Sequence, residues 1–274
     1  MDVQKMRIIN DAAASGATAL DIRCHAISSP PDLSHLTALQ KLNISHNYLQ
    51  TLPSLPQGLQ ILNVCYNRLH TLLDLPRTLQ ILNISHNQLH VLPELYQLTA
   101  LQELNAMSNR LQTLPHLPLE LRVLNVAGNI ISALPELSHL TALHSLDASS
   151  NELQILPSLP HSLRALNVSH NDIRSLPAIP RHLQALNIAD NRIRALSDIS
   201  HIQRTCICIN PIMHSHINND FDRLDLAYDH GEVTALRRHI QLFTDRATLY
   251  GILPGDVTGI IGEYVCYVPV GLIN

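Results

Sequence analysis

The chain has 274 residues, enough for two ordinary domains or one elongated array; leucine dominates, tryptophan is absent and phenylalanine occurs only twice. A formal net charge of −4 at pH 7 gives no electrostatic reason to expect a nucleic acid or an anionic membrane as a partner. The five cysteines are odd in number, and no secretory signal or apolar run of membrane-spanning length is visible, so we expect a cytosolic working compartment.

The first segment, Met1 to Ala14, has the pattern of a short amphipathic helix. Val3, Met6 and Ile9 fall on one side of it, and Ser15-Gly16 provides a stop signal. We expect this helix to cap the open end of the structure that follows it.

One pattern of eleven residues recurs eight times in the middle of the chain. It reads L-x-x-L-x-a-x-x-N-x-a, in which a is an aliphatic residue and x is any residue. The copies start at Leu39, Leu59, Leu79, Leu101, Leu121, Leu143, Leu163 and Leu183. They are spaced 20 or 22 residues apart, and this period is typical of a leucine-rich repeat, in which each copy forms one turn of a wide coil. A single turn cannot bury its own leucines, so stacking supplies the stability.

Within each turn the pattern predicts a short strand. Leu62 and Val64 alternate with Asn63 and Cys65, so the first two point inward and the other two outward. Stacked turns then form a parallel sheet with strands about 4.8 Å apart. The asparagine of each pattern falls at a sharp turn, where its amide can pair buried backbone groups. We therefore predict a structural role for Asn47, Asn67, Asn87, Asn109, Asn129, Asn151, Asn171 and Asn191, which we call the asparagine spine.

The segment that closes each turn has two lengths. The shorter one carries two prolines three residues apart, as in Leu52-Pro53-Ser54-Leu55-Pro56, which favours an extended polyproline stretch over a helix. The longer one occurs at residues 92–101 and 134–143, LPELYQLTAL and LPELSHLTAL. A short convex side opposite a sheet predicts a gently curved, open coil.

Less regular turns flank the eight copies. His25 lies 22 residues before Asn47 and marks a degenerate first turn, while Ile202, Thr205 and Asn210 keep the frame of a tenth. Three helices are expected after it, between Asn219 and Gly231, from Glu232 to Phe243, and near Asp256 to Tyr267. The predicted fold is an α/β solenoid with parallel strands on its concave face: a capping helix in 1–16, about ten leucine-rich turns in 17–212 and a helical cap in 213–274.

The alternation of short, proline-paired turns with longer ones resembles the leucine-rich repeats of injected bacterial effectors of the YopM and IpaH type. The resemblance covers roughly Leu39 to Leu196. It implies a protein that a host-contacting bacterium secretes by a non-classical route, type III or type IV, into the host cytoplasm. It also implies that the array binds a protein, either a host protein or another effector.

The resemblance does not extend to the ubiquitin-ligase members of that group. Those members carry a large helical catalytic domain with a cysteine nucleophile in a C-x-D setting. Here only 62 residues follow Ile212, and the nearest cysteines read Cys206-Ile207-Cys208. We therefore do not expect ligase activity.

Three rows of outward side chains are expected to line the concave face. The first, the amide row, consists of Asn43, Asn63, Asn83, Asn105, Asn125, Asp147, Asn167 and Asn187. The second, the small row, consists of Ser45, Cys65, Ser85, Met107, Ala127, Ser149, Ser169 and Ala189. The third, the variable row, consists of His46, Tyr66, His86, Ser108, Gly128, Ser150, His170 and Asp190. The amides could simply ladder with each other along the sheet, whereas the variable row, with Tyr66 between two histidines, favours partner binding. The candidate partner-binding residues are His46, Asn63, Tyr66, Asn83, His86, Asn105, Met107 and His170.

No metal, cofactor or catalytic group is expected. His46 and His86 lie two turns apart, about 10 Å, which is too far for shared ligation, and His214-x-His216 fits a solvated loop. A nucleophile at Cys206 or Cys208 would need a base and an oxyanion site that the sequence does not place. The predicted function is that of a monomeric, non-enzymatic protein-binding module.

The alternative is an adaptor that recruits host ubiquitin-ligase machinery through its C-terminal helices. The segment from Leu253 to Tyr264 resembles the first helix of an F-box, but only ten residues follow Tyr264. An apolar capping helix accounts for the same residues.

Overall fold

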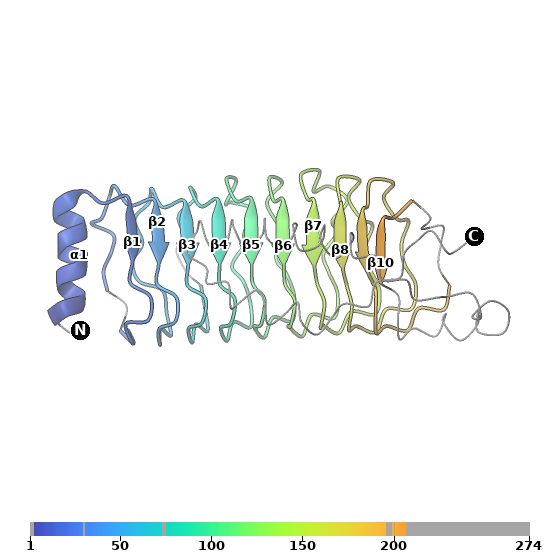
Figure 1. Ribbon diagram of the computed structural model, residues 1–274, viewed down its shortest axis with the longest axis horizontal. Coiled ribbons are helices and arrows are strands. Elements are labelled where there is room, and N and C mark those ends of the chain that lie inside the picture. Colours follow the sequence, from blue (N-terminus) through green and yellow to red (C-terminus); the bar gives the residue numbers. More distant parts are fainter. Residues whose placement is uncertain (1–2, 30, 73–74, 196–198, 200, 207–274) are drawn as a thin grey trace, which may run out of the picture.

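The structure is a computed structural model that describes residues 3–29, 31–72, 75–195, 199 and 201–206. Ten short strands lie side by side in chain order and form one parallel sheet, with a helix standing at its N-terminal end (Figure 1). The expected leucine-rich solenoid is confirmed. Residues 207–274, which hold the three expected C-terminal helices and Asn210, lie outside the described residues.

The elements have the following bounds: α1 Val3–Ser15, β1 Ala19–Asp21, β2 Lys41–Asn43, β3 Ile61–Asn63, β4 Ile81–Asn83, β5 Glu103–Asn105, β6 Val123–Asn125, β7 Ser145–Asp147, β8 Ala165–Asn167, β9 Ala185–Asn187 and β10 Arg204–Cys206. Each strand has three residues, and the backbone beyond it continues to bond to the next turn, as the amide of Val64 does to the carbonyl of Asn83 at 2.9 Å. In the part of the chain that the structure describes, no helix besides α1 occurs, as the paired prolines predicted.

Helix α1 covers the N-terminal end of the core. Its Ile9 is buried, and Ile8 and Ala12 pack against the same core. The helix ends where Gly16 adopts a left-handed backbone with φ +62°, and the amide of Ala17 donates to the carbonyl of Ala12 at 3.0 Å. The sequence predicted this stop one residue early.

The middle residue of each strand points into the core. Along β2 to β9 these residues are all leucines, each at most 2% exposed: Leu42, Leu62, Leu82, Leu104, Leu124, Leu146, Leu166 and Leu186. The register aligns each with the next, as in Leu62 with Leu82. The core is therefore a continuous leucine column that no single turn could bury. In β10 the same position holds Thr205, whose buried hydroxyl has no partner among the described residues.

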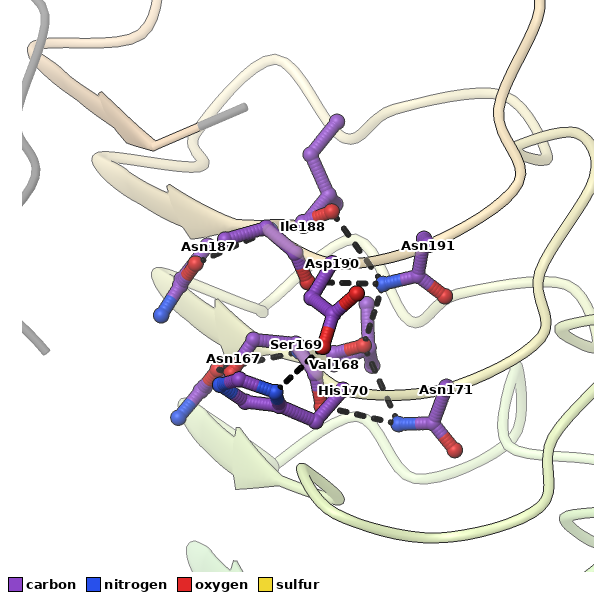
Figure 2. Close-up of polar contacts among 10 residues, drawn as sticks. Asn167, Val168, Ser169, His170, Asn171, Asn187, Ile188, Asp190 and Asn191 are labelled. Carbon is purple, nitrogen blue, oxygen red and sulfur yellow. Dashed lines mark hydrogen bonds and ion pairs between the residues drawn. The ribbon is translucent and has the colours of Figure 1, made fainter. Parts of the chain in front are cut away.

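The asparagine spine joins neighbouring turns through hydrogen bonds. Asn87 is typical: its Nδ2 donates to the carbonyls of Ile84 and Ser85 in its own turn and of Val64 in the previous turn, at 3.0–3.1 Å. Its Oδ1 accepts the amide of Leu69 in the previous turn at 3.0 Å. The seven other spine asparagines repeat this arrangement (two of them in Figure 2). The predicted structural role is confirmed.

Candidate partner-binding face

The amide row is held mainly by its own turn. Each side-chain Oδ1 accepts the backbone amide two residues on, as Asn63 does from Cys65 at 3.1 Å and Asn83 from Ser85 at 3.1 Å. All eight members of the row share this bond. Bonds from one turn to the next are made to aspartates: Asn167 donates to Asp147 within the row, and Asn43 donates to Asp21 at the equivalent position of β1. The amides therefore do more to shape the turn than to ladder along the sheet.

Burial of the amide row changes along the array. Asn63 is 3% and Asn83 4% exposed, whereas Asn105, Asp147 and the later members are half-buried. The Nδ2 of Asn63 is enclosed without a hydrogen-bond partner among the described residues. Of the candidate binding residues, Asn63 and Asn83 thus present little area of their own, while Asn105 and Met107 are partly accessible.

The first members of the variable row form a stacked column. The rings of His46 and Tyr66 lie 4.5 Å apart between centroids with an interplanar angle of 11°, and those of Tyr66 and His86 lie 4.1 Å apart at 9°. We call these three residues the aromatic stack. The Tyr66 ring stands between the two imidazoles, so the structure brings three predicted residues together as one surface feature.

A left-handed backbone explains how these side chains are presented. All eight residues of the variable row have φ between +51° and +63°, and only one of them, Gly128, is a glycine. This conformation lets the chain turn sharply into the spine asparagine, and it costs free energy for the seven residues with a side chain. The spine bonds that follow hold the turn in place.

His170 is not part of the aromatic stack. Its Nδ1 lies 2.7 Å from Oδ2 of Asp190 in the next turn, and the two side chains point toward each other (Figure 2). Ser108, Gly128 and Ser150 separate it from His86 along the variable row. His170 was predicted as a binding residue from its place in the row, but its pairing with Asp190, the next member of the row, was not predicted.

Asp147 is the acidic member of the otherwise amide row. Its Oδ1 accepts from the backbone amide and hydroxyl of Ser149 at 3.0 and 2.6 Å, and its Oδ2 accepts from Nδ2 of Asn167 at 3.1 Å. Burial raises the pKa of this carboxyl, against the lowering effect of those hydrogen bonds. Asp147 was predicted as a member of the row but not as a binding residue, although a lone acid in a run of asparagines was an available signal.

Another surface column follows the spine by one residue. The guanidinium of Arg68 lies over the Tyr48 ring, 4.8 Å from its centroid, and Arg192 forms an ion pair with Asp172 at 2.7 Å. Tyr48 is 49% exposed. These contacts join neighbouring turns, and they were not predicted from the sequence.

The candidate nucleophile Cys206 occupies an amide-row position, in register with Asn187, and it is buried. Cys208 and the two histidines at 214 and 216 lie outside the described residues. Among the residues that the structure describes, no three metal-ligating side chains gather, and no helix is long and apolar enough to cross a bilayer.

The stacked parallel strands and the asparagine spine define a leucine-rich-repeat protein. Models of this repeat match the chain at residues 38–59, 77–119 (two copies) and 160–175. No curated protein sequence matches the chain.

Among solved structures, YopM from Yersinia enterocolitica WA-314 is similar, with 39% identity and a TM-score of 0.73 over 76% of this chain and 46% of that one. YopM from Yersinia pestis, a leucine-rich effector protein, shares 31% identity with a TM-score of 0.54, over 76% of this chain and 71% of that one. The leucine-rich-repeat domain of a Shigella effector shares 27% identity with a TM-score of 0.50, over 69% and 76% of the two chains.

The chain therefore belongs to the YopM-like family of bacterial leucine-rich-repeat effectors. It spans less than half the length of the Yersinia enterocolitica protein that it matches.

Proposed function

We propose that this protein is a bacterial effector that acts without catalysis, by binding one protein on its concave face. The partner is a host protein or another effector, and the route of delivery is a type III or type IV secretion system into the host cytoplasm, where the effector works as a monomer. Membership of the YopM-like family supports this proposal, and so does a fold that typically serves as a protein-interaction scaffold.

The aromatic stack is the observation that carries the proposal. Aromatic side chains contribute disproportionately to protein interfaces, and here three rings are already ordered by contact with each other. Side chains that are fixed before binding lose less conformational entropy when a partner docks. All three rings are half-buried, so part of each remains available to a partner.

Affinity purification with a double variant, Tyr66→Ala with His86→Ala, tests this proposal. The wild-type chain should recover a partner from host lysate or from co-expressed bacterial proteins, and the double variant should lose it while its circular dichroism spectrum stays unchanged. The matched control is Tyr96→Ala with His139→Ala, which removes the same two residue types from exposed positions in the connections between strands. Equal recovery by the wild type and the Tyr66/His86 variant would refute the role of the stack.

The division of the chain into residues 1–16, 17–212 and 213–274 is part of the same proposal, with the last segment as a cap. Deletion of residues 253–274 separates this role from that of an adaptor. Loss of cooperative unfolding would indicate a cap. A folded protein that loses one partner and keeps another would indicate an adaptor for ubiquitin-ligase machinery.

A further inference from the structure

Two aspartates occupy equivalent places in the array, and they allow a direct comparison. Asp21 ends β1 and Asp147 ends β7, at the strand position that holds asparagine in β2 to β6, β8 and β9. Each carboxylate accepts the backbone amide two residues on, Asp21 from Arg23 at 3.1 Å and Asp147 from Ser149 at 3.0 Å. Each also accepts from the amide-row asparagine of the next turn, at 3.5 and 3.1 Å.

The two carboxylates differ in their surroundings: Asp21 is exposed and has a cation beside it, whereas Asp147 is half-buried and accepts the Ser149 hydroxyl instead. The guanidinium of Arg23 lies 3.3 Å from Oδ2 of Asp21. The residue at the corresponding place beside Asp147 is Ser149, and no described side chain forms an ion pair with Asp147. A half-buried carboxylate held by neutral donors alone is less well stabilised than one beside a guanidinium.

The residues around Asp147 are small. Ser145 and Ala165, at the starts of β7 and β8, are small, and so are Ser149 and Ser150. At the N-terminal end of the array the first strand residues are larger: Lys41, Ile61 and Ile81. The aromatic stack also lies beside the amide row there. The amide-row residues Asn43, Asn63 and Asn83 are accordingly at most 8% exposed. A long side chain from outside can thus approach Asp147 but not the equivalent asparagines of β2 to β4.

We propose that Asp147 is the anchor point for one cationic side chain, a lysine or an arginine, of the protein that docks on the concave face. The incoming ammonium or guanidinium takes the place that Arg23 holds beside Asp21. This inference deepens the proposed function and rests on it for the identity of the ligand as a protein segment.

The charges around Asp147 indicate what kind of segment carries the cation. The neighbouring strands β6 and β8 contribute Val123, Asn125, Ala165 and Asn167 to this region, none of them charged. An arginine directly precedes each of the two neighbouring strands, Arg122 before β6 and Arg164 before β8. A segment with dense positive charge would be repelled by them, so the site favours a single cation in an otherwise neutral or acidic segment.

Nuclear magnetic resonance on the purified protein tests this proposal with two short peptides, acetyl-Gly-Lys-Gly-amide and its norleucine counterpart, which has the same stem and no charge. The observables are the carboxyl carbon of Asp147 and the side-chain amide of Asn167. Because a single ion pair with a short, flexible peptide binds weakly, the response should stay unsaturated up to about 50 mM peptide. The lysine peptide should lower the pKa of Asp147 and shift the Asn167 amide, and the norleucine peptide should do neither.

Two variants make the result specific. Ser149→Arg copies the arrangement of Asp21 and Arg23, so it should lower the pKa of Asp147 without any peptide and abolish the response to lysine. Asp21→Asn removes the carboxylate that already has a cation and should leave the response unchanged. The proposal is overturned if the two peptides act alike, if neither produces a shift, or if the lysine response persists in Ser149→Arg.

The same variants separate this inference from the proposed function. For a partner recovered on the concave face, Asp147→Asn should weaken binding about fivefold, whereas the Tyr66/His86 double variant removes it. A lysine response at Asp147 without any recovered partner would leave the cation site standing and count against the proposed function. A recovered partner whose affinity is unchanged by Asp147→Asn would refute the cation site and leave the proposed function standing.

Discussion

Replacing Asn87 with alanine should destabilise the array by about 3 kcal/mol, and the hydrogen bonds of the spine show why. The carbonyls of Val64 and Ile84 each accept from two spine asparagines, so each keeps one donor when Asn87 is lost. The carbonyl of Ser85 keeps the amide of Tyr66. The amide of Leu69, in contrast, loses its Oδ1 acceptor and stays buried.

The magnitude follows from this count. An orphaned buried amide costs about 1–3 kcal/mol, and each of the three carbonyls that keeps only one donor adds a fraction of an ordinary hydrogen bond, about 0.5 kcal/mol. Together these terms give the figure of about 3 kcal/mol. The change is large because the bonds cross from one turn to the next, and stacking between turns is the source of stability in a repeat array.

Urea denaturation followed by circular dichroism measures the effect, with Gln88→Ala as a control at the adjacent, half-buried position. The control should change the free energy of unfolding by less than about 0.5 kcal/mol. Hydrogen exchange of the Leu69 amide gives a local measure, and its protection should fall in Asn87→Ala before that of distant turns. A loss of less than about 1 kcal/mol for Asn87→Ala would refute the claim that the spine bonds hold the turns together.

Three further changes test other features of the array. Thr205→Val removes a buried hydroxyl that has no partner among the described residues, and valine has the same shape as threonine. Thermal unfolding should therefore show a stability gain of about 1 kcal/mol, whereas a loss of stability would mean that the hydroxyl is hydrogen-bonded. Asp147→Asn should stabilise the isolated protein at pH 7. The pKa of Asp147 is raised in the fold above its ordinary value of 3.8, so ionising the carboxyl destabilises the folded protein at neutral pH, and this penalty disappears as the pH falls through the folded pKa towards 3.8. The stability difference between Asp147→Asn and the wild type should therefore shrink in that window. A difference that does not change with pH would contradict the assigned cause. Gly128→Ala should cost about 1 kcal/mol in urea denaturation, because φ is +63° and the new Cβ would lie 3.4 Å from Oγ of Ser108; an unchanged midpoint would show that this turn carries no strain.

Features that recur identically in every turn were predictable from the sequence. The alternation of Leu62 and Val64 with outward residues fixed the strand and its inward face, since side chains of a strand alternate with a period of two. The spine asparagines were also predictable, because an invariant sharp turn leaves the same backbone groups to be paired in every repeat. Register followed from the constant period, which places Leu62 beside Leu82.

Contacts between side chains of different turns were only partly predictable. The sequence placed Tyr66 between His46 and His86, but the near-parallel stacking depends on a left-handed backbone that the pattern does not reveal. It likewise placed His170 beside Asp190 without showing that the two point toward each other. Side-chain rotamers respond to their immediate packing, and one sequence does not specify that packing.

The sequence by itself determined the solenoid, because aliphatic residues that recur once per turn can be shielded from water only by the turns on either side. Tertiary structure alone decided which outward residues a partner can reach. Asn63 and Asp147 hold equivalent places in the repeat, yet the first is 3% exposed and the second half-buried beside small residues. Accessibility depends on the size and orientation of side chains in adjacent turns, and these are set only when the turns have stacked.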